Sequence, residues 1–281
     1  MRLAMSNIAW DVAEDDAVAT LLQRYAVDAI DIAPGKYFPD LHNASDDEIT
    51  RVGAWWRARG IDITGMQALL FGTSGLNVFG PPESQDAMLR HLGAVCRIAG
   101  QLRAPRLVFG SPKARDRSGL NDQQADQMAI DFFARLGDVA SAHGVMICLE
   151  PNPASYGCNF MTHSAMTGRI VELVAHPSIR MQLDTGAIAA NQEDPRQVIV
   201  DNAARIGHIH ASEPELAPLG DRATRHDVIG ALVATYLPQH VVSIEMLATK
   251  PEPHLASLER ALRVADRWYR SASQLSAGVA A

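Results

Sequence analysis

The sequence lacks several features that define large classes of proteins. Its only three cysteines, Cys96, Cys148 and Cys158, follow no regular spacing, which indicates reduced thiols in a cytoplasmic protein rather than a disulfide framework. Cys148 lies within an apolar run, where a small core side chain is expected. No run of 18 apolar residues occurs, and the first residues contain no signal-peptide hydrophobic region. We therefore expect a soluble protein with no membrane partner.

An excess of positive charge is also missing. The chain carries 25 Lys and Arg residues against 32 Asp and Glu residues, a formal net charge of −7. Because nucleic-acid-binding surfaces need clustered Lys and Arg, no nucleic-acid partner is expected. Two glycine-rich signatures are absent as well: no G-x-G-x-x-G follows the first apolar run, and no G-x-x-x-x-G-K-[ST] occurs. The strongest sequence evidence for a nucleotide-cofactor fold is therefore missing.

The chain does contain a regular alternation of apolar runs and amphipathic segments. Eight short runs are apolar along most of their length, as expected for strands buried on both faces. They lie at residues 2–7, 28–33, 61–67, 105–110, 145–150, 179–184, 206–211 and 241–246. A segment with helical character follows each run. This alternation predicts the α/β fold class and a single (β/α)8 barrel, the TIM barrel.

Start and stop signals support the predicted helices. Ser45 followed by Glu48 forms a capping box, and Gly60 ends the helix that it opens. Asn121 caps a long helix that ends before Gly144.

The 281 residues are enough for one large α/β domain or two small ones. No linker divides the chain, so we expect the barrel to occupy residues 1–270. Residues 271–281 are mostly small or polar and are predicted to form a flexible C-terminal tail.

Four acidic or imidazole side chains close the last four apolar runs: Glu150, Asp184, His210 and Glu245. In a closed parallel barrel, side chains at the carboxyl ends of the strands converge on one mouth, where enzymes of this fold build their sites. Three carboxylates and one imidazole would suit a hard divalent cation. Any one of these glutamates could instead be a salt-bridge partner, but four such residues on successive strands favour a metal site.

Such a site suits the removal of a proton next to a carbonyl. A divalent metal that bridges a carbonyl and its neighbouring hydroxyl lowers the pKa of the intervening C–H and stabilises the resulting enediolate. Glu150 and Glu245 lie three strands apart in a ring of eight, so they approach the mouth from well-separated directions. We therefore predict that these two glutamates are catalytic as well as metal-binding, and that Asp184 and His210 are plain ligands.

The strand ends LEPNP, LDTG, HIHASE and SIEM resemble the xylose-isomerase-like TIM barrel superfamily, and within it the sugar (phosphate) isomerase/epimerase branch with its ketose 3-epimerases. The resemblance covers roughly residues 2 to 269. It implies that Glu150, Asp184, His210 and Glu245 bind one Mn²⁺, Mg²⁺ or Co²⁺ ion. It also implies that the two glutamates exchange a proton on opposite faces of a carbon of a small carbohydrate-like substrate. Barrels of this family often pair, which leaves a homo-oligomer open.

The sequence departs from the ketose 3-epimerases at two positions. They commonly carry a His three residues after the aspartate ligand and an Arg six residues after the histidine ligand, and both hold substrate oxygens. Here these positions are Ala187 and Leu216. The leading hypothesis is therefore a metal-dependent sugar isomerase or epimerase that does not bind a free ketohexose through these two side chains. The alternatives are a lyase or dehydratase on a sugar-like substrate, and a barrel that binds a sugar without converting it.

Several further residues are candidates for contact with the substrate. Lys113 and Arg115, after the fourth apolar run, could bind an anionic group, or they could belong to a solvated loop. Trp10 is predicted to form a wall of the pocket.

Two more candidates are identified by the alternation of a strand. Asn152 lies two residues beyond the first glutamate, and His208 two residues before the histidine ligand, so each shares a face with a ligand. A buried histidine bonded to a neighbouring backbone is the alternative for His208. Behind the ligands, Gln182 is a candidate supporting group, and Glu213 is expected to orient the imidazole of His210.

Overall fold

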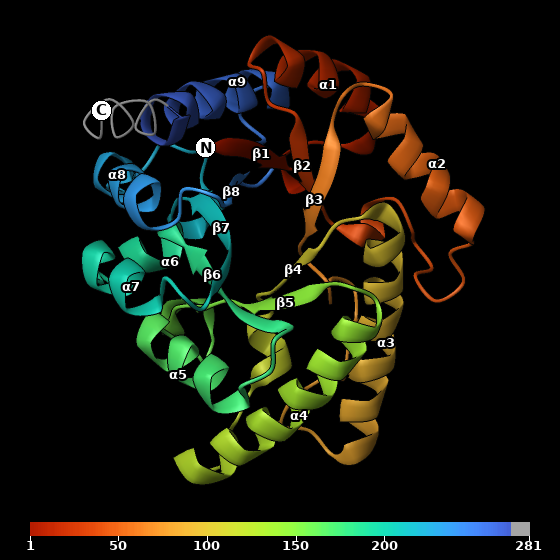
Figure 1. Ribbon diagram of the computed structural model, residues 1–281, viewed down its shortest axis with the longest axis vertical. Coiled ribbons are helices and arrows are strands. Elements are labelled where there is room, and N and C mark those ends of the chain that lie inside the picture. The colour runs from red at the N-terminus through yellow and green to blue at the C-terminus, as the bar shows by residue number, and fades with distance from the viewer. Residues whose placement is uncertain (271–281) are drawn as a thin grey trace.

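The computed structural model describes residues 1–270, and their eight strands form one closed parallel barrel in sequence order (Figure 1). The strands are β1 (Arg2–Ser6), β2 (Ala29–Ile32), β3 (Asp62–Met66), β4 (Arg106–Phe109), β5 (Met146–Leu149), β6 (Ile179–Asp184), β7 (Ile206–Ser212) and β8 (Val241–Glu245). Strands β8 and β1 pair with Leu3 opposite Val242, which closes the ring. The predicted (β/α)8 barrel is confirmed. The predicted tail, residues 271–281, lies outside the described residues.

The helices form an outer ring around the strands (Figure 1). They are α1 (Asp15–Arg24), α2 (Asp46–Arg57), α3 (Pro82–Leu102), α4 (Asp122–Ala142), α5 (Ser164–Val174), α6 (Thr185–Ala190), α7 (Pro195–Asn202), α8 (His226–Tyr236) and α9 (His254–Ala265). The capping box of Ser45 is confirmed, since its Oγ accepts a bond from the backbone N–H of Glu48 and the Glu48 carboxylate accepts one in return. Asn121 caps α4 in the same way.

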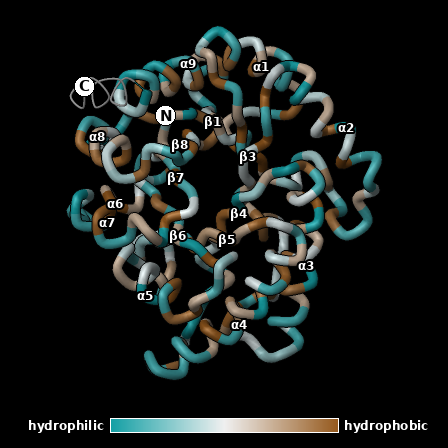
Figure 2. The backbone as a smooth tube through the Cα atoms, viewed as in Figure 1, coloured by the Kyte–Doolittle hydropathy of each residue, from teal (hydrophilic) through white to brown (hydrophobic). Residues whose placement is uncertain are grey.

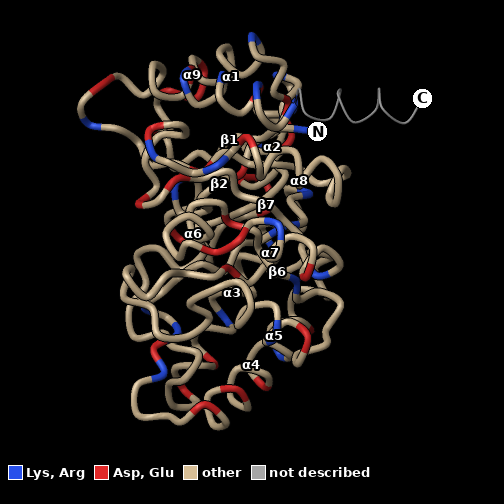
Figure 3. Tube along the Cα trace, turned by 90° about the vertical axis from the view of Figure 1, so that its left-hand side faces the viewer, with Lys and Arg blue, Asp and Glu red and all other residues tan. Residues whose placement is uncertain are grey.

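The core fills the barrel and the space between strands and helices. Every residue of β2, β7 and β8 is buried, as the continuous apolar runs predict. Figure 2 shows hydrophobic residues along the strands and hydrophilic segments at the periphery. In Figure 3, Lys and Arg are interspersed with Asp and Glu over the described residues. Within residues 1–270, each helix is too short or too polar to cross a membrane.

The pairing register of the last three strands brings polar side chains of neighbouring strands side by side. A register shift between Met181 and Gln182 leaves Asp184 opposite His210 on the neighbouring strand. On the next pair, Ser212 lies opposite Glu245. The sheet itself thus positions polar groups at the carboxyl ends of these strands, where the helices do not cover them.

Candidate active site

The four predicted ligands meet at the carboxyl ends of β5 to β8. One ligand atom from each of Glu150, Asp184, His210 and Glu245 lies within 4.8 Å of the others. His210 Nδ1 is 3.1 Å from Glu245 Oε2, 3.4 Å from Glu150 Oε1 and 3.9 Å from Asp184 Oδ2. All four residues are buried. We call these four residues the ligand cluster.

The electrostatics of the ligand cluster suit a cation. Burial and the nearby charges of Glu150 and Glu245 raise the pKa of the Asp184 carboxyl to about 8. Burial by itself would lower the pKa of His210, but its contacts with the same two glutamates raise that pKa well above its ordinary value. Glu150 Oε1 is buried without a hydrogen-bond partner. Three carboxylates and one imidazole nitrogen are a donor set that Mn²⁺, Mg²⁺ or Co²⁺ accepts, so the residues fit such an ion.

Side-chain amides hold both glutamates of the cluster. Asn152 Nδ2 donates to Glu150 Oε2 at 3.0 Å, and Gln67 Nε2 donates to Glu245 Oε1 at 2.7 Å. In each glutamate the other carboxylate oxygen faces His210. Asn152 was predicted from the sequence as a substrate contact, and Gln67 was not predicted at all. The signal for Gln67 was present, because it directly follows the apolar strand β3, just as Glu150 follows β5.

Asp184 is anchored from two directions. Ser212 Oγ donates to its Oδ2 at 2.8 Å, and the backbone N–H of Ala187 donates to its Oδ1 at 2.5 Å. The second bond is the N-terminal cap of α6, so the helix fixes the carboxylate as it begins.

Gln182 and His208 form a layer beneath the ligand cluster. With its amide oxygen turned toward His210, Gln182 accepts from the His210 backbone N–H at 3.1 Å, as a supporting group would. His208 is fully buried, does not line the cavity, and its Nε2 lies 2.7 Å from Asp31 Oδ2. The predicted substrate contact of His208 is therefore wrong. His208 lies two residues before His210, so its side chain is one layer deeper in the barrel. At that depth it contacts the carboxylate of Asp31 on β2.

Glu213 does not reach His210. Its carboxylate bonds the backbone N–H groups of Gly220 at 2.8 Å and Thr224 at 3.3 Å, and it lies 3.1 Å from His226 Nε2. The expectation that Glu213 orients the imidazole is corrected: the chain turns outward after β7, so this carboxylate ties the following loop to α8.

Trp10 does not form a wall of the pocket. The ring is 1% exposed, and its Nε1 donates to Asp15 Oδ1 at 2.7 Å. A short 3₁₀ turn at Asn7–Ala9 directs the indole toward α1 and leaves Ile8 to line the cavity instead.

The predicted anion-binding side chains also lie elsewhere. Arg115 is fully buried, and its Nη1 donates to the backbone carbonyl of Glu150 at 2.7 Å. Lys113 is exposed, and neither residue lines the cavity. Arg115 thus supports the segment that carries Glu150 and does not contact a substrate. Sequence spacing could not reveal this, because only the packing of the loop decides which way the guanidinium points.

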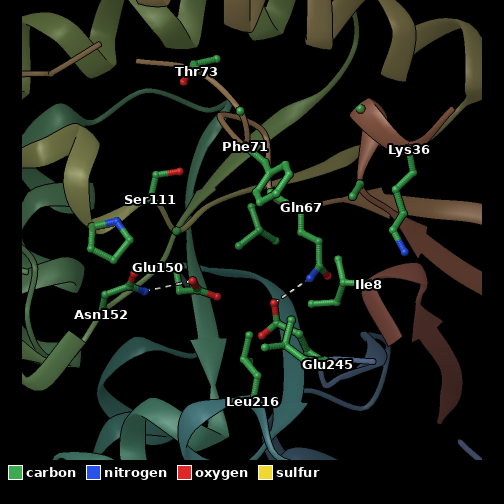
Figure 4. Close-up of a pocket in the computed structure, with 18 of the residues that line it drawn as sticks. Ile8, Lys36, Gln67, Phe71, Thr73, Ser111, Glu150, Asn152, Leu216 and Glu245 are labelled. Atoms are coloured by element: carbon green, nitrogen blue, oxygen red, sulfur yellow. Dashed lines mark hydrogen bonds between the residues drawn. The ribbon is translucent and has the colours of Figure 1, made fainter. Parts of the chain in front are cut away.

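A cavity of about 1330 Å³ opens over the ligand cluster. Glu150, Asp184, Glu245 and Asn152 lie on its surface together with Gln67. Figure 4 shows the two hydrogen-bonded pairs, Asn152 with Glu150 and Gln67 with Glu245, facing each other across it. Ala187 and Leu216, the two positions that depart from the ketose 3-epimerases, line the same cavity. Polar side chains at these positions would reach a ligand, so alanine and leucine here make this part of the cavity surface less polar.

Solved structures with the same barrel include several enzymes. The structure of an L-ribulose 3-epimerase has a TM-score of 0.80 at 16% identity, covering 100% of this chain and 98% of that chain. A 3-keto-D-glucoside 4-epimerase from E. coli has a TM-score of 0.75 at 17% identity, covering 96% and 99%. The IOLI protein with a bound zinc atom has a TM-score of 0.70 at 16% identity, covering 97% and 98%. At these identities the likeness shows the fold alone.

No curated protein sequence matches the chain. The family described as xylose isomerase-like TIM barrel matches it over residues 19–268, which is most of its length. The order of the strands, the closed ring and this match agree. The chain belongs to the xylose isomerase-like TIM barrel family.

Proposed function

We propose that this protein is a divalent-metal-dependent isomerase or epimerase that moves a proton at the carbon next to a carbonyl of a sugar or sugar derivative. The observation that carries the proposal is the opposed pair of Glu150 and Glu245, both within the ligand cluster and both on the cavity surface. Bound at the cluster, Mn²⁺, Mg²⁺ or Co²⁺ would polarise the carbonyl and its neighbouring hydroxyl. A protein that only binds sugars has no need of two opposed acid–base groups.

The two glutamates reach the cavity from strands that lie three apart around the ring. Each gives one oxygen to an amide N–H, from Asn152 or from Gln67, and this bond restricts rotation of the carboxylate. In the proposed reaction one glutamate removes the proton from one face of the substrate carbon. The other, carrying a proton, delivers it to the opposite face. Asp184 and His210 complete the donor set without exchanging protons with the substrate.

The solved relatives support the reaction class and a bound metal ion. Two of them are named as epimerases, of L-ribulose and of 3-keto-D-glucoside, and a third holds zinc. Ala187 and Leu216 in the cavity wall favour a substrate other than a free ketohexose. A lyase or dehydratase remains the second candidate, because β-elimination starts with the same proton removal and the same wall leaves room for a leaving group.

The test begins with metal stoichiometry. After treatment with a chelator and loading with Mn²⁺, elemental analysis should find about one equivalent in the wild type and little in His210→Ala. Exchange of carbon-bound hydrogen with D₂O is then followed by NMR over a panel of ketoses and keto-glycosides. An isomer as product supports the proposal, and loss of water or of a leaving group identifies the lyase.

The variants Glu150→Gln and Glu245→Gln should abolish exchange. Glu172→Gln is the matched control, since this glutamate pairs with Arg205 on the surface, away from the cavity. Exchange that persists in both site variants would refute the acid–base roles. A wild type that binds sugars but no metal would indicate a barrel that binds a sugar without converting it.

A further inference from the structure

The cavity over the ligand cluster is larger than a simple sugar requires. Ligand pockets for drug-sized molecules usually enclose about 300–1,000 Å³. Here one continuous volume of about 1330 Å³ extends from Glu150 and Glu245 to Phe71 and Leu247 at the rim. Space for a second, sizeable group therefore adjoins the place where the proton is moved.

Several large hydrocarbon side chains line the cavity around the ligand cluster, among polar residues such as Asp40, Thr73 and Ser111. We call Ile8, Phe38, Leu41, Phe71, Leu216 and Leu247 the apolar wall. Phe71 is 89% exposed and Leu247 is 50% exposed, although such side chains are normally withdrawn from water. Figure 4 shows Phe71 and Leu216 directed into the cavity from opposite sides, with Ile8 beside Gln67. Clustered exposed apolar groups of this kind mark binding sites.

The backbone that presents this wall is held in an unfavourable conformation. Ala68, Glu215 and Leu216 have φ values of 54°, 62° and 53°, in the left-handed region that residues with a Cβ rarely adopt. A local turn bond from Phe71 N–H to the Ala68 carbonyl and a tertiary bond from Leu247 N–H to the Leu216 carbonyl hold these turns. Strained turns persist only where the surrounding structure enforces them, and they concentrate at ligand sites.

Of the described lining residues, none is a Lys or Arg that is free to bind an anionic ligand. Among the described residues that line it, Lys36 is the only Lys or Arg, and its ammonium group already donates to the backbone carbonyls of Asn7 and Trp10. A phosphate or carboxylate would enter a site that holds the carboxylates of Glu150, Asp184 and Glu245. The wall therefore favours an uncharged, apolar group over an anion.

We propose that the apolar wall binds a ring-sized apolar substituent, such as an aromatic aglycone, of a neutral sugar substrate whose polar part lies on the ligand cluster. The position of the polar part rests on the proposed function, whereas the preference for an apolar substituent rests on the wall alone. A substituted sugar also explains Ala187 and Leu216, because apolar side chains there contact an aglycone better than polar ones.

The experiment compares two uncharged probes that differ only in the aglycone, methyl and phenyl 3-oxo-β-D-glucopyranoside. Each is titrated calorimetrically into the Mn²⁺-loaded protein. We expect the phenyl compound to bind about tenfold more tightly or better, because the ring buries additional apolar surface. Equal affinities, or no binding of either probe at millimolar concentration, would overturn the proposal.

Phe71→Ala should reduce the preference for the phenyl compound several-fold and leave the affinity for the methyl compound unchanged. Leu173→Ala is the matched control, because Leu173 is an exposed residue of α5 that does not line the cavity. A preference that survives in Phe71→Ala refutes the role of the wall. Light scattering on the same variant shows whether Phe71 instead joins two copies of the chain: loss of a dimer with an unchanged preference would refute the proposal.

His210→Ala separates this inference from the proposed function. The apolar wall does not include the ligand cluster, so the ratio of phenyl to methyl affinity should persist in this variant even where metal and exchange are lost. A wild type without metal or exchange that still prefers the phenyl compound would refute the proposed function only. A loss of the preference with exchange intact would refute only the present inference.

Discussion

The side chain of Gln67 donates a 2.7 Å hydrogen bond to the carboxylate of Glu245, and both residues are buried at the base of the cavity. The bond joins the end of β3 to the end of β8. Its counterpart on the other side of the cavity is the 3.0 Å bond from Asn152 to Glu150. Each proposed acid–base group is thus held by one neutral amide donor, which fixes its direction without adding a charge.

Replacement of Gln67 by methionine removes this donor and keeps the length of the side chain. We expect the rate of proton exchange to fall roughly 10- to 100-fold, because a hydrogen bond to a charged group contributes about 1.5–3 kcal/mol. Metal stoichiometry should be unchanged, since Gln67 is not a ligand. The measurement is exchange in D₂O beside Gln23→Met, whose amide bonds the exposed Arg59 carbonyl. An exchange rate equal to the wild type would remove Gln67 from the machinery.

A methyl group at Gly110 should displace Glu150. A Cβ at this position would lie 2.1 Å from Glu150 Oε2, so the carboxylate must rotate away. Because the obstacle is the end of a flexible side chain, we expect little loss of stability. We expect a loss of exchange activity on the order of 10- to 100-fold, as misplaced catalytic groups typically give.

Gly35→Ala is the matched control for Gly110→Ala. Gly35 lines the same cavity, and a Cβ there would meet nothing within 4 Å. Activity and thermal unfolding of the two variants are measured side by side. Equal activities would show that the close approach of Gly110 to Glu150 has no functional consequence.

The buried pair of Asp31 and His208 should contribute strongly to stability. Asp31→Ala leaves the buried His208 imidazole without its partner, and a buried polar group left without its hydrogen bond costs about 1–3 kcal/mol. Asp28→Ala, three residues earlier, removes an exposed bond to Arg2 and should cost less than about 1 kcal/mol. Urea unfolding of both variants gives the comparison. A loss in Asp31→Ala no larger than that in Asp28→Ala would contradict the expected contribution.

The carboxylate of Glu213 should make the free energy of unfolding depend on pH. Burial by itself raises its pKa, but the bonds from His226, Thr224 and Gly220 hold it below the ordinary value of 4.5. The charged form is therefore favoured in the folded state. Its contribution is complete above pH 4.5 and is lost as the pH falls through the lower folded-state pKa.

The isosteric variant Glu213→Gln tests this dependence. Its free energy of unfolding should be lower than that of the wild type at pH 7, and the difference should shrink below pH 4.5. Urea titrations at several pH values measure the difference. A difference that stays constant down to pH 3 would show that the carboxylate charge contributes nothing.

Two histidines on the same strand show where inference from the sequence stops. Alternation correctly put His208 and His210 on the same face, yet only His210 reaches the cluster. The pattern carries the direction of a side chain but not its depth along the barrel axis. Depth depends on strand stagger and on the register shift between β6 and β7. Periodicity within a single strand contains neither quantity.

The sequence by itself determined the barrel, the order of its strands and the identity of the four residues of the ligand cluster. Continuous apolar runs and helix caps are local signals, and a closed parallel ring brings polar strand ends together whatever the loops do. Only the tertiary structure decided that Gln67 supports Glu245, that Arg115 is buried beneath Glu150 and that Trp10 turns away from the cavity. Those outcomes depend on contacts between segments far apart in the chain, where packing and hydrogen-bond geometry, not local spacing, choose the partner.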